Sequence, residues 1–459
     1  MACWVAPFKF RLAQRVKDNH QFLTSAPVGR VIGTLALPTI VSMLVTSLYN
    51  LADTLFVGRL GTQATAAVGV VFTVMTLFQA LGFFFGHGSG NYIAIQLGAG
   101  NRQEARHMVA TGFLYALIGG LLLALFTLLF ASPLCRWIGA TPTILPLAEE
   151  YLRSVLWGGP FMVGTLLLNV QIRQQGNALL GMIGTVSGAL LNLLLNPLFI
   201  FGLGLGIRGA GWATTVSQAA SFFVLLYMTR RGGNIPVDLR QVNFSPRYIR
   251  AILAGGTPSL TRQGLGSTAT LLLNLAAAGF GDAAIAAMTI VSRLNFMIHS
   301  AVIGLGQGYQ PLCGFCYGAG LYERVKEGFR FCTRVGTLFL LLISLLGAGF
   351  REEIIALFRD DPEVIRIGGE ALGWQLITYP LGAFMLLSNM MMQALNFSLR
   401  ANLLAAARRG LFFIPLLLWL PSHFGLLGLE ISQPLADLFT FALSLPLLIY
   451  TFRQLTPRA

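Results

Sequence analysis

The sequence contains few charged residues. Asp, Glu, Lys and Arg make up only 10% of its 459 residues, whereas a soluble domain has roughly 25%. Hydrophobic residues make up 55%. This balance argues against an ordinary soluble domain and predicts a membrane protein with many spans. The five cysteines are scattered along the chain and odd in number, so no disulfide framework is expected.

The usual signatures of soluble enzymes are also missing. The sequence has no Walker loop, no G-x-G-x-x-G after a strand, no H-E-x-x-H and no G-x-S-x-G, so neither an ATP-driven pump nor a common hydrolase is indicated. The net charge is +14. Its basic residues lie in short loops between apolar runs, which indicates membrane orientation rather than a nucleic-acid partner.

Long apolar runs dominate the chain. Runs of 18 residues or more predict twelve membrane spans, because about 20 apolar residues cross a bilayer as a helix. We expect an all-α polytopic protein with two pseudo-symmetric six-helix bundles. Its predicted parts are a cytoplasmic N-terminal segment (1–29), a first bundle (30–229), a cytoplasmic linker (230–250), a second bundle (251–452) and a cytoplasmic tail (453–459).

The two halves repeat one another. When the sequence is shifted by 220 residues, Pro38 meets Pro258 and Asn169 meets Asn389. Glycines align in the same register, and we interpret the agreement as an internal duplication. With the N-terminus inside, cytoplasmic segments hold 22 Lys and Arg and the opposite side holds seven. This bias predicts that both termini are cytoplasmic and that the bundles form a parallel repeat with a cavity between them.

Few polar side chains lie at membrane depth, and Asp53 is the first of them. It is an acid within an apolar run that begins at Val31. Such groups are costly in a bilayer and mark a transport pathway by default. The candidates beside Asp53 are Asn192, Asn196, Thr214, Arg262, Gln263, Arg293, Asn295, His299 and Gln393.

Several motifs resemble one transporter family. The stretch "LALPTIVSMLVTSLYNLADTLFVGRLG" resembles the first helix of the MATE (multidrug and toxic compound extrusion) family, which carries a proline, an Asp-Thr pair and Gly-x-Leu-Gly. "QLGAGNRQEAR" at 96–106 and "LNPLFIFGLGLGIRGAGWAT" at 195–214 resemble later family segments. "TPSLTRQGLGS" at 257–267 and "GQGYQPLCGFCYGAG" at 306–320 are most similar to the MepA-like branch.

The resemblance implies a cation site in the first bundle. Carried over residue by residue, its members are Asp53, Asn192, Asn196 and Thr214. Many relatives have an Asp where this chain has Asn196, so the expected site has one negative charge fewer. It can hold Na⁺ through oxygen ligands, or a proton on a buried carboxylate. No cofactor is expected besides H⁺ or Na⁺ as the coupling ion.

The resemblance also implies a multidrug antiporter of the cytoplasmic (inner) membrane. It would export amphipathic, often cationic organic compounds by alternating access. Because proline removes one helical hydrogen bond and lets a helix bend, we expect Pro38 to be a hinge in the first helix. Arg262, Gln263, Arg293, Asn295, His299 and Gln393 are the expected lining of the substrate cavity. We expect a monomer embedded in lipid.

Alternative interpretations stay open at this point. Asp53 could pair with an arginine, the Asn and Thr side chains could form ordinary interhelical hydrogen bonds, and Pro38 could be a static kink. Arg262 and Arg293 could pair with Asp53, cap carbonyl groups near Pro258 or contact an anionic part of a substrate. Alternative functions are an organic-anion or metabolite exporter, a flippase for lipid-linked precursors, and a membrane-embedded enzyme.

Overall fold

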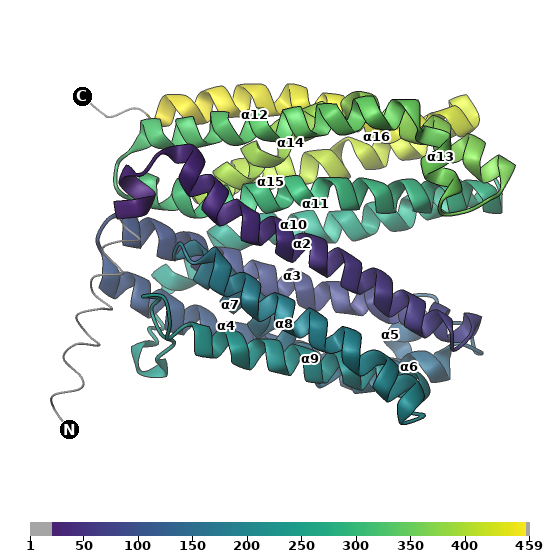
Figure 1. The fold of residues 1–459 in the computed structure, drawn as a ribbon, viewed down its shortest axis with the longest axis horizontal. Helices are drawn as coiled ribbons and strands as arrows, with labels where there is room; N and C mark the ends of the chain where they lie inside the picture. Colours follow the sequence, from purple (N-terminus) through teal and green to yellow (C-terminus); the bar gives the residue numbers. More distant parts are fainter. Residues whose placement is uncertain (1–20, 456–459) are drawn as a thin grey trace.

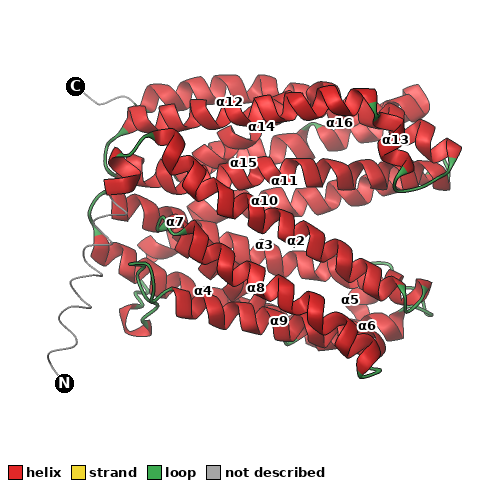
Figure 2. Ribbon diagram, viewed as in Figure 1, coloured by secondary structure: helices red, strands yellow, loops and turns green. Residues whose placement is uncertain are grey.

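The computed structural model describes residues 21–455, and the structure of these residues is helical, with short loops (Figure 2). The elements of the first half are α2 (Val28–Gly58), α3 (Thr62–Gly98), α4 (Arg102–Leu129), α5 (Ala131–Trp137), α6 (Leu145–Leu156), α7 (Gly159–Gln174), α8 (Ala178–Pro197), η2 (Leu198–Gly202) and α9 (Gly206–Met228). Those of the linker and second half are η3 (Leu239–Gln241), α10 (Pro246–Ala278), α11 (Asp282–Gly318), α12 (Tyr322–Gly349), α13 (Arg351–Ala356), α14 (Pro362–Ala394), α15 (Ser398–Ala406), η4 (Ala407–Leu411) and α16 (Phe413–Gln454).

The helices provide the twelve predicted crossings. Within residues 21–455, eight helical segments are long and apolar enough to span a membrane, and α6 with α7 forms a ninth span bent by 52°. One of the eight, Ser398–Gln454, has 57 residues and is too long for one crossing. It breaks at Gly425, whose φ of 60° suits a residue without a side chain, so it crosses twice. The helices α9 and α10, of 23 and 33 residues, are less apolar but long enough to complete the twelve.

The second half repeats the first in its helix boundaries. A shift of 220 residues places α3 on α11 and α4 on α12 without any change of ends. The turns that precede and follow α3 also repeat, because Gly61 and Gly281 have φ values of 116° and 97°, and Gly100 and Gly320 have 78° and 74°. These are backbone conformations that glycine adopts without strain. The duplication predicted from the sequence is therefore present in the backbone.

The two halves meet at one end of the molecule. We call it the closed end; it is where α3 finishes at Gly98 and α11 finishes at Gly318. From there the halves diverge toward the opposite, open end, where α5, α6 and α13 lie (Figure 1). At the closed end a Cβ on Gly98 would be 2.1 Å from the Phe315 carbonyl oxygen, and one on Gly318 would be 2.0 Å from that of Ile95. Only glycine permits this approach of α3 to α11.

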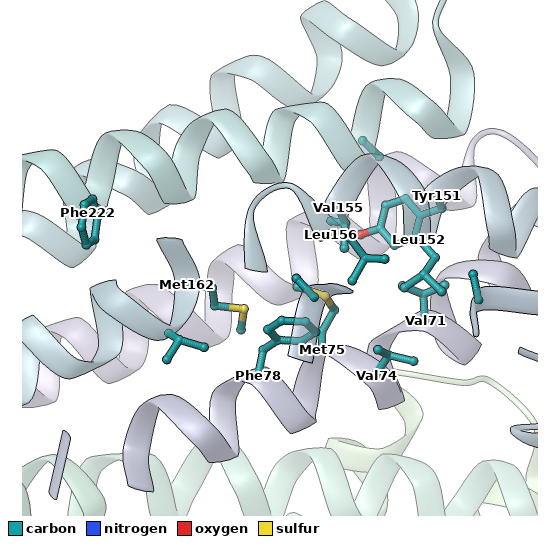
Figure 3. Close-up of a cluster of buried hydrophobic side chains, with 14 of the residues drawn as sticks. Val71, Val74, Met75, Phe78, Tyr151, Leu152, Val155, Leu156, Met162 and Phe222 are labelled. Atoms are coloured by element: carbon teal, nitrogen blue, oxygen red, sulfur yellow. The ribbon is translucent and has the colours of Figure 1, made fainter. Parts of the chain in front are cut away.

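Each half has its own apolar core. In the first half the core lies between α3, α6, α7 and α9, where Val71, Met75, Phe78, Tyr151 and Leu152 pack together (Figure 3). A corresponding core fills the second half between α10, α11, α14 and α16. Leucines on the outer faces of α4 and α12 are exposed. Buried cores with apolar outer surfaces are what a helical bundle in lipid requires.

The helix α2 connects the two halves (Figure 1). Its first part packs on the second half, where the Thr39 hydroxyl donates to the Gly304 carbonyl oxygen at 2.6 Å. Its last part packs on the first half, where Asp53 accepts a hydrogen bond from Asn196 of α8. A rearrangement of the halves must therefore change the course or contacts of α2.

Candidate functional site

Asp53 lies near the open end of α2 and contacts α8. Its Oδ1 accepts a hydrogen bond of 2.8 Å from Nδ2 of Asn196. The same amide nitrogen donates to Oδ1 of Asn192, one helical turn earlier, at 2.7 Å. The spacing of four residues places both asparagines on one face of α8. The structure thus joins three of the predicted cation-site residues directly.

Thr214 of α9 completes this network. Its hydroxyl accepts a hydrogen bond of 3.3 Å from Nδ2 of Asn192 and donates to the Ala210 carbonyl oxygen at 3.1 Å. Two phenols that the sequence analysis missed, Tyr49 of α2 and Tyr151 of α6, lie close enough to interact with both Asp53 and Thr214. Tyr49 is one helical turn before Asp53, and this i, i+4 spacing was the available signal.

The network is rich in oxygen atoms and lacks a positive charge. Oδ1 of Asn196 is buried and has no hydrogen-bond partner. Within residues 21–455, none of the ion pairs includes Asp53. Of the alternatives left open for Arg262 and Arg293, an ion pair with Asp53 is not present among the residues that the structure describes. A half-buried carboxylate beside amide and hydroxyl oxygens can hold a proton or a hard cation such as Na⁺.

Pro38 is buried where α2 contacts the second half. The helix continues through it, although proline removes one backbone hydrogen bond. The Ser42 hydroxyl donates to the Pro38 carbonyl oxygen at 2.9 Å, and neighbouring Thr39 bonds to Gly304. The weakest point of α2 therefore lies beside its contact with the opposite half.

The residues predicted to line a substrate cavity do not form one group. Arg262 of α10 donates from Nη1 to Oδ1 of Asn389 at 3.2 Å, and Gln263 is half-buried next to it. Arg293 is exposed on α11. Gln393 is buried at the closed end, where its Nε2 donates to the Gly255 carbonyl oxygen at 3.0 Å and to the Ser259 hydroxyl at 2.8 Å.

Asn295 and His299 belong to a buried polar cluster within the second half. Nδ2 of Asn295 donates to Oε1 of Gln375 at 3.0 Å. Nδ1 of His299 lies 3.0 Å from the Asn295 carbonyl oxygen, and the ring packs edge-on against Tyr379, with centroids 5.1 Å apart. These partners make the pair part of the second bundle's interior.

The sequence analysis missed the ion pair at the centre of this cluster. Arg408 of η4 donates from Nε to Oδ1 of Asp437 on α16 at 2.9 Å, and Asp437 is only 3% exposed. The total of 22 cytoplasmic Lys and Arg expected from the sequence includes Arg408 and Arg409. The structure instead places both inside the helical span formed by α15, η4 and the start of α16. An acid in the apolar stretch around Asp437 was the signal that could have revealed the pair.

The same expected total of 22 includes Arg173, which is buried in the structure. It lies near the end of α7 with 2% exposure, and its Nη1 donates to Oε1 of Gln307 in the opposite half at 2.8 Å. Without Arg173, Arg408 and Arg409, 19 of the 22 basic residues assigned to cytoplasmic segments remain. The charge bias between the two sides is therefore kept.

Comparison with known proteins identifies the family. The MatE family model matches residues 38–198 and 258–417, more than half of the chain. The chain belongs to the MATE family of transporters. The two matches begin 220 residues apart, which is the period of the internal repeat. Membership confirms the resemblance read from the motifs and makes the protein a transporter rather than a membrane-embedded enzyme.

Individual relatives are similar over nearly their whole length. The multidrug export protein MepA of Staphylococcus aureus (strain MSSA476) is 26% identical over 444 residues, which are 96% of this chain and 97% of that protein. A crystal structure of MATE in complex with MaL6 is 26% identical, with a TM-score of 0.89 over 95% of this chain and 99% of that one. A multidrug resistance MATE family transporter in an outward-facing conformation has a TM-score of 0.90 at 24% identity, over 96% of this chain and 99% of that one, and supports the fold.

Proposed function

We propose that this MATE transporter is a secondary active exporter that exchanges H⁺ or Na⁺ for small amphipathic organic compounds. The observation that carries the proposal is the carboxylate of Asp53, which is bonded to Asn196 in a network of oxygen atoms and lies outside every ion pair of residues 21–455. A carboxylate that is surrounded by oxygen atoms and has no counter-ion is stabilised when a cation binds next to it. The occupancy of the site can therefore bias the conformation of α2.

In this proposal, the described conformation of the transporter is its outward-facing state. The basic residues near the closed end favour that end as cytoplasmic, so the open end faces outward and the Asp53 site can be reached from outside. A cation entering there binds before the halves rearrange. Because α2 contacts both halves, the bound cation can stabilise one course of this helix more than the other. Exchange requires that cation and substrate differ in their affinity for the two states.

The substrate class is proposed from two lines of support. Relatives of similar length are named multidrug export proteins. Asp53 of the first half lies outside every ion pair of residues 21–455, and such a carboxylate suits organic compounds that carry a positive charge. The proposed setting is the cytoplasmic membrane, with both termini inside.

Transport in proteoliposomes tests the proposal. Proton and sodium gradients are imposed separately, and uptake of a fluorescent organic cation such as ethidium is followed. We expect one of the two gradients to drive transport by the wild type. The Asp53→Asn variant should lose gradient-driven transport almost completely, because a neutral amide imitates the cation-bound state, while dye binding to purified protein stays within about twofold.

A surface acid provides the control. Glu363 is exposed at the open-end start of α14, and Glu363→Gln should transport like the wild type. If Asp53→Asn responds to the gradients as well as Glu363→Gln does, Asp53 is not the coupling residue and the proposed function loses its main support.

A further inference from the structure

A second charged site lies between the halves at the closed end, and the cation site does not account for it. Arg173 is 2% exposed, and its Nη1 is held by Gln307 at 2.8 Å and by Asn169 at 3.4 Å. Its Nε and Nη2 are buried and have no hydrogen-bond partner. These two nitrogens form one edge of the guanidinium, which is the edge that binds a carboxylate with two parallel hydrogen bonds.

A second arginine, Arg262, and a histidine, His87, belong to the same region of the closed end. Arg262 and Arg173 are both near enough to His87 to act on its charge. The Nδ1 atom of His87 lies 3.1 Å from the Phe83 carbonyl oxygen and 3.0 Å from the Ser259 hydroxyl, while its Nε2 is buried without a partner. Among the ion pairs of residues 21–455, none includes Arg173 or Arg262. The cluster therefore contains two cationic groups and no internal counter-ion.

The internal repeat shows that the two arginines are not part of the pattern of contacts that both halves share. In both halves one asparagine holds the guanidinium: Asn169 accepts from Arg173, and its repeat partner Asn389 accepts from Arg262. Each asparagine also donates to a backbone carbonyl group, that of Gly181 at 3.0 Å and that of Ala401 at 2.6 Å. The arginines are not repeat partners of one another, because position 393 holds Gln and position 42 holds Ser. The repeat alone does not require either positive charge.

An uncompensated guanidinium in this position is costly. Arginine does not lose its proton in proteins, and a buried charge that no opposite charge compensates is destabilising. An anion that occupies the free edge of Arg173 offsets this cost. The site also joins α3, α7, α10, α11 and α14, which are helices of both halves. It therefore lies where alternating access must open and close the protein.

We propose that the free edge of Arg173, with Arg262 and His87 in the same region, binds the carboxylate or a similar oxyanion group of the transported molecule. The inference rests on the proposed exporter function and refines its substrate class, since compounds with both a positive and a carboxylate group would be bound by opposite charges. Gln307 holds Arg173 from the opposite half in the described state. Opening of the closed end separates this pair and makes the guanidinium accessible to the anion.

Binding to purified, detergent-solubilised full-length protein tests the inference. The probes are a fluorescent rhodamine with a free carboxylate and its methyl ester, which differ only in that group, and binding is followed by fluorescence anisotropy. We expect Arg173→Gln to weaken binding of the acid by about tenfold or more, the value of a charge-assisted hydrogen bond. Binding of the ester should change by less than about twofold.

A second variant keeps the arginine. Gln307→Glu supplies an internal carboxylate next to Nη1 of Arg173, and it should weaken binding of the acid selectively, because the guanidinium is then neutralised from within the protein. The matched control is Arg59→Gln, which removes an exposed positive charge at the end of α2 and should leave both affinities unchanged. Thermal unfolding of each variant shows whether the fold is kept.

An inorganic ion is the competing occupant. Sodium chloride and inorganic phosphate are therefore titrated in the same unfolding assay. The site holds an inorganic anion, and the inference is wrong, if two results occur together. The first is that either salt stabilises the wild type but not Arg173→Gln. The second is that the ratio of the affinity for the acid to the affinity for the ester is the same in both proteins. Equal weakening of acid and ester in Arg173→Gln and Gln307→Glu also overturns it. Because binding needs no ion gradient, these outcomes are distinct from a failure of coupling at Asp53.

Discussion

At the scale of single residues, two acids within the helical bundles, Asp53 and Asp437, have different surroundings and therefore different expected roles. Asp437 is paired with Arg408 at 2.9 Å, so its charge is compensated inside the protein. Among the described residues, Asp53 accepts a hydrogen bond from the Asn196 amide at 2.8 Å and takes part in no ion pair. A paired carboxylate stabilises one structure, whereas one without a counter-ion responds to cations from solution. This difference is the reason for assigning coupling to Asp53 rather than to Asp437.

The variant Asn196→Asp tests whether Asn196 shares the cation site. The substitution places a second carboxylate at the position that now donates to Asp53. Two carboxylates at this distance do not both stay charged unless a cation lies between them. We expect the pH profile of transport to move to higher pH, or the Na⁺ dependence to become stronger. Transport is measured from about pH 5.5 to 8.5 with and without Na⁺, and an unchanged profile on both axes excludes a shared site.

The ion pair of the second half is expected to be structural. Asp437→Asn leaves Arg408 buried without a counter-charge and should lower the free energy of unfolding by about 3–5 kcal/mol. The double variant Arg408→Met, Asp437→Leu should recover most of this loss. The control is Arg366→Gln, which breaks an exposed pair with Glu370 at 3.4 Å and should cost less than about 1 kcal/mol. Denaturation in detergent measures all three, and equal losses at both pairs would contradict the prediction.

Sequence patterns predicted residues of the first-half site better than those of the second half. The acid Asp53 and the asparagines of α8 could be identified because each interrupts a long apolar run and fits a family motif. Asp437 in its apolar stretch was a signal for a partner inside the bundle, but no local pattern indicated that Arg408 is this partner or that Arg173 is buried. Their burial depends on partners 29 and 134 residues away, Asp437 and Gln307. Pairings of this kind follow from tertiary packing, which local patterns do not encode.

At the scale of elements, α2 is the helix whose shape is expected to matter most. Its first part is tied to Gly304 of α11 and its last part to Asn196 of α8. Pro38 lies at the first of these contacts, the one with α11, and lacks the backbone N–H that would form a further helical hydrogen bond there. A bend at Pro38 would let the two ends of α2 move with different halves.

Pro38→Ala is therefore predicted to slow the change of state more than it weakens substrate binding. Alanine restores a helical hydrogen bond and favours a straight α2. We expect the transport rate in proteoliposomes to fall severalfold, while the dissociation constant of the fluorescent cation changes by less than about twofold. The control is Pro246→Ala, at the first turn of α10, where proline interrupts no helical bond. Normal turnover of Pro38→Ala would leave Pro38 as a static kink.

At the scale of the whole molecule, the twelve crossings and the two-fold repeat were predictable, whereas the state of the transporter was not. Apolar runs and the 220-residue period are local or periodic signals that survive in one sequence. Which end is closed depends on contacts between α3 and α11, and the same residues must also permit the opposite state. The glycines Gly98 and Gly318 show how the closed state is built, because they allow the backbones of these helices to touch.

Gly318→Ala should shift the molecule away from the described state. A Cβ at this position would be 2.0 Å from the Ile95 carbonyl oxygen, so α11 and α3 must separate at the closed end. Spin labels at Asn101→Cys and Leu321→Cys, both exposed at the closed end, report the separation through their distance distribution. We expect the longer distances to gain population in Gly318→Ala. Labels at Thr143→Cys and Glu363→Cys, exposed at the open end, should shift to shorter distances at the same time.

The control for this prediction is Gly264→Ala, because a Cβ there meets no atom within 4 Å. It should leave both distance distributions unchanged. A shift at the closed end without an opposite shift at the open end would mean that Gly318→Ala only loosens the local packing. Opposite shifts at the two ends are what alternating access requires, since the halves then move as units about the contacts that α2 makes with both of them.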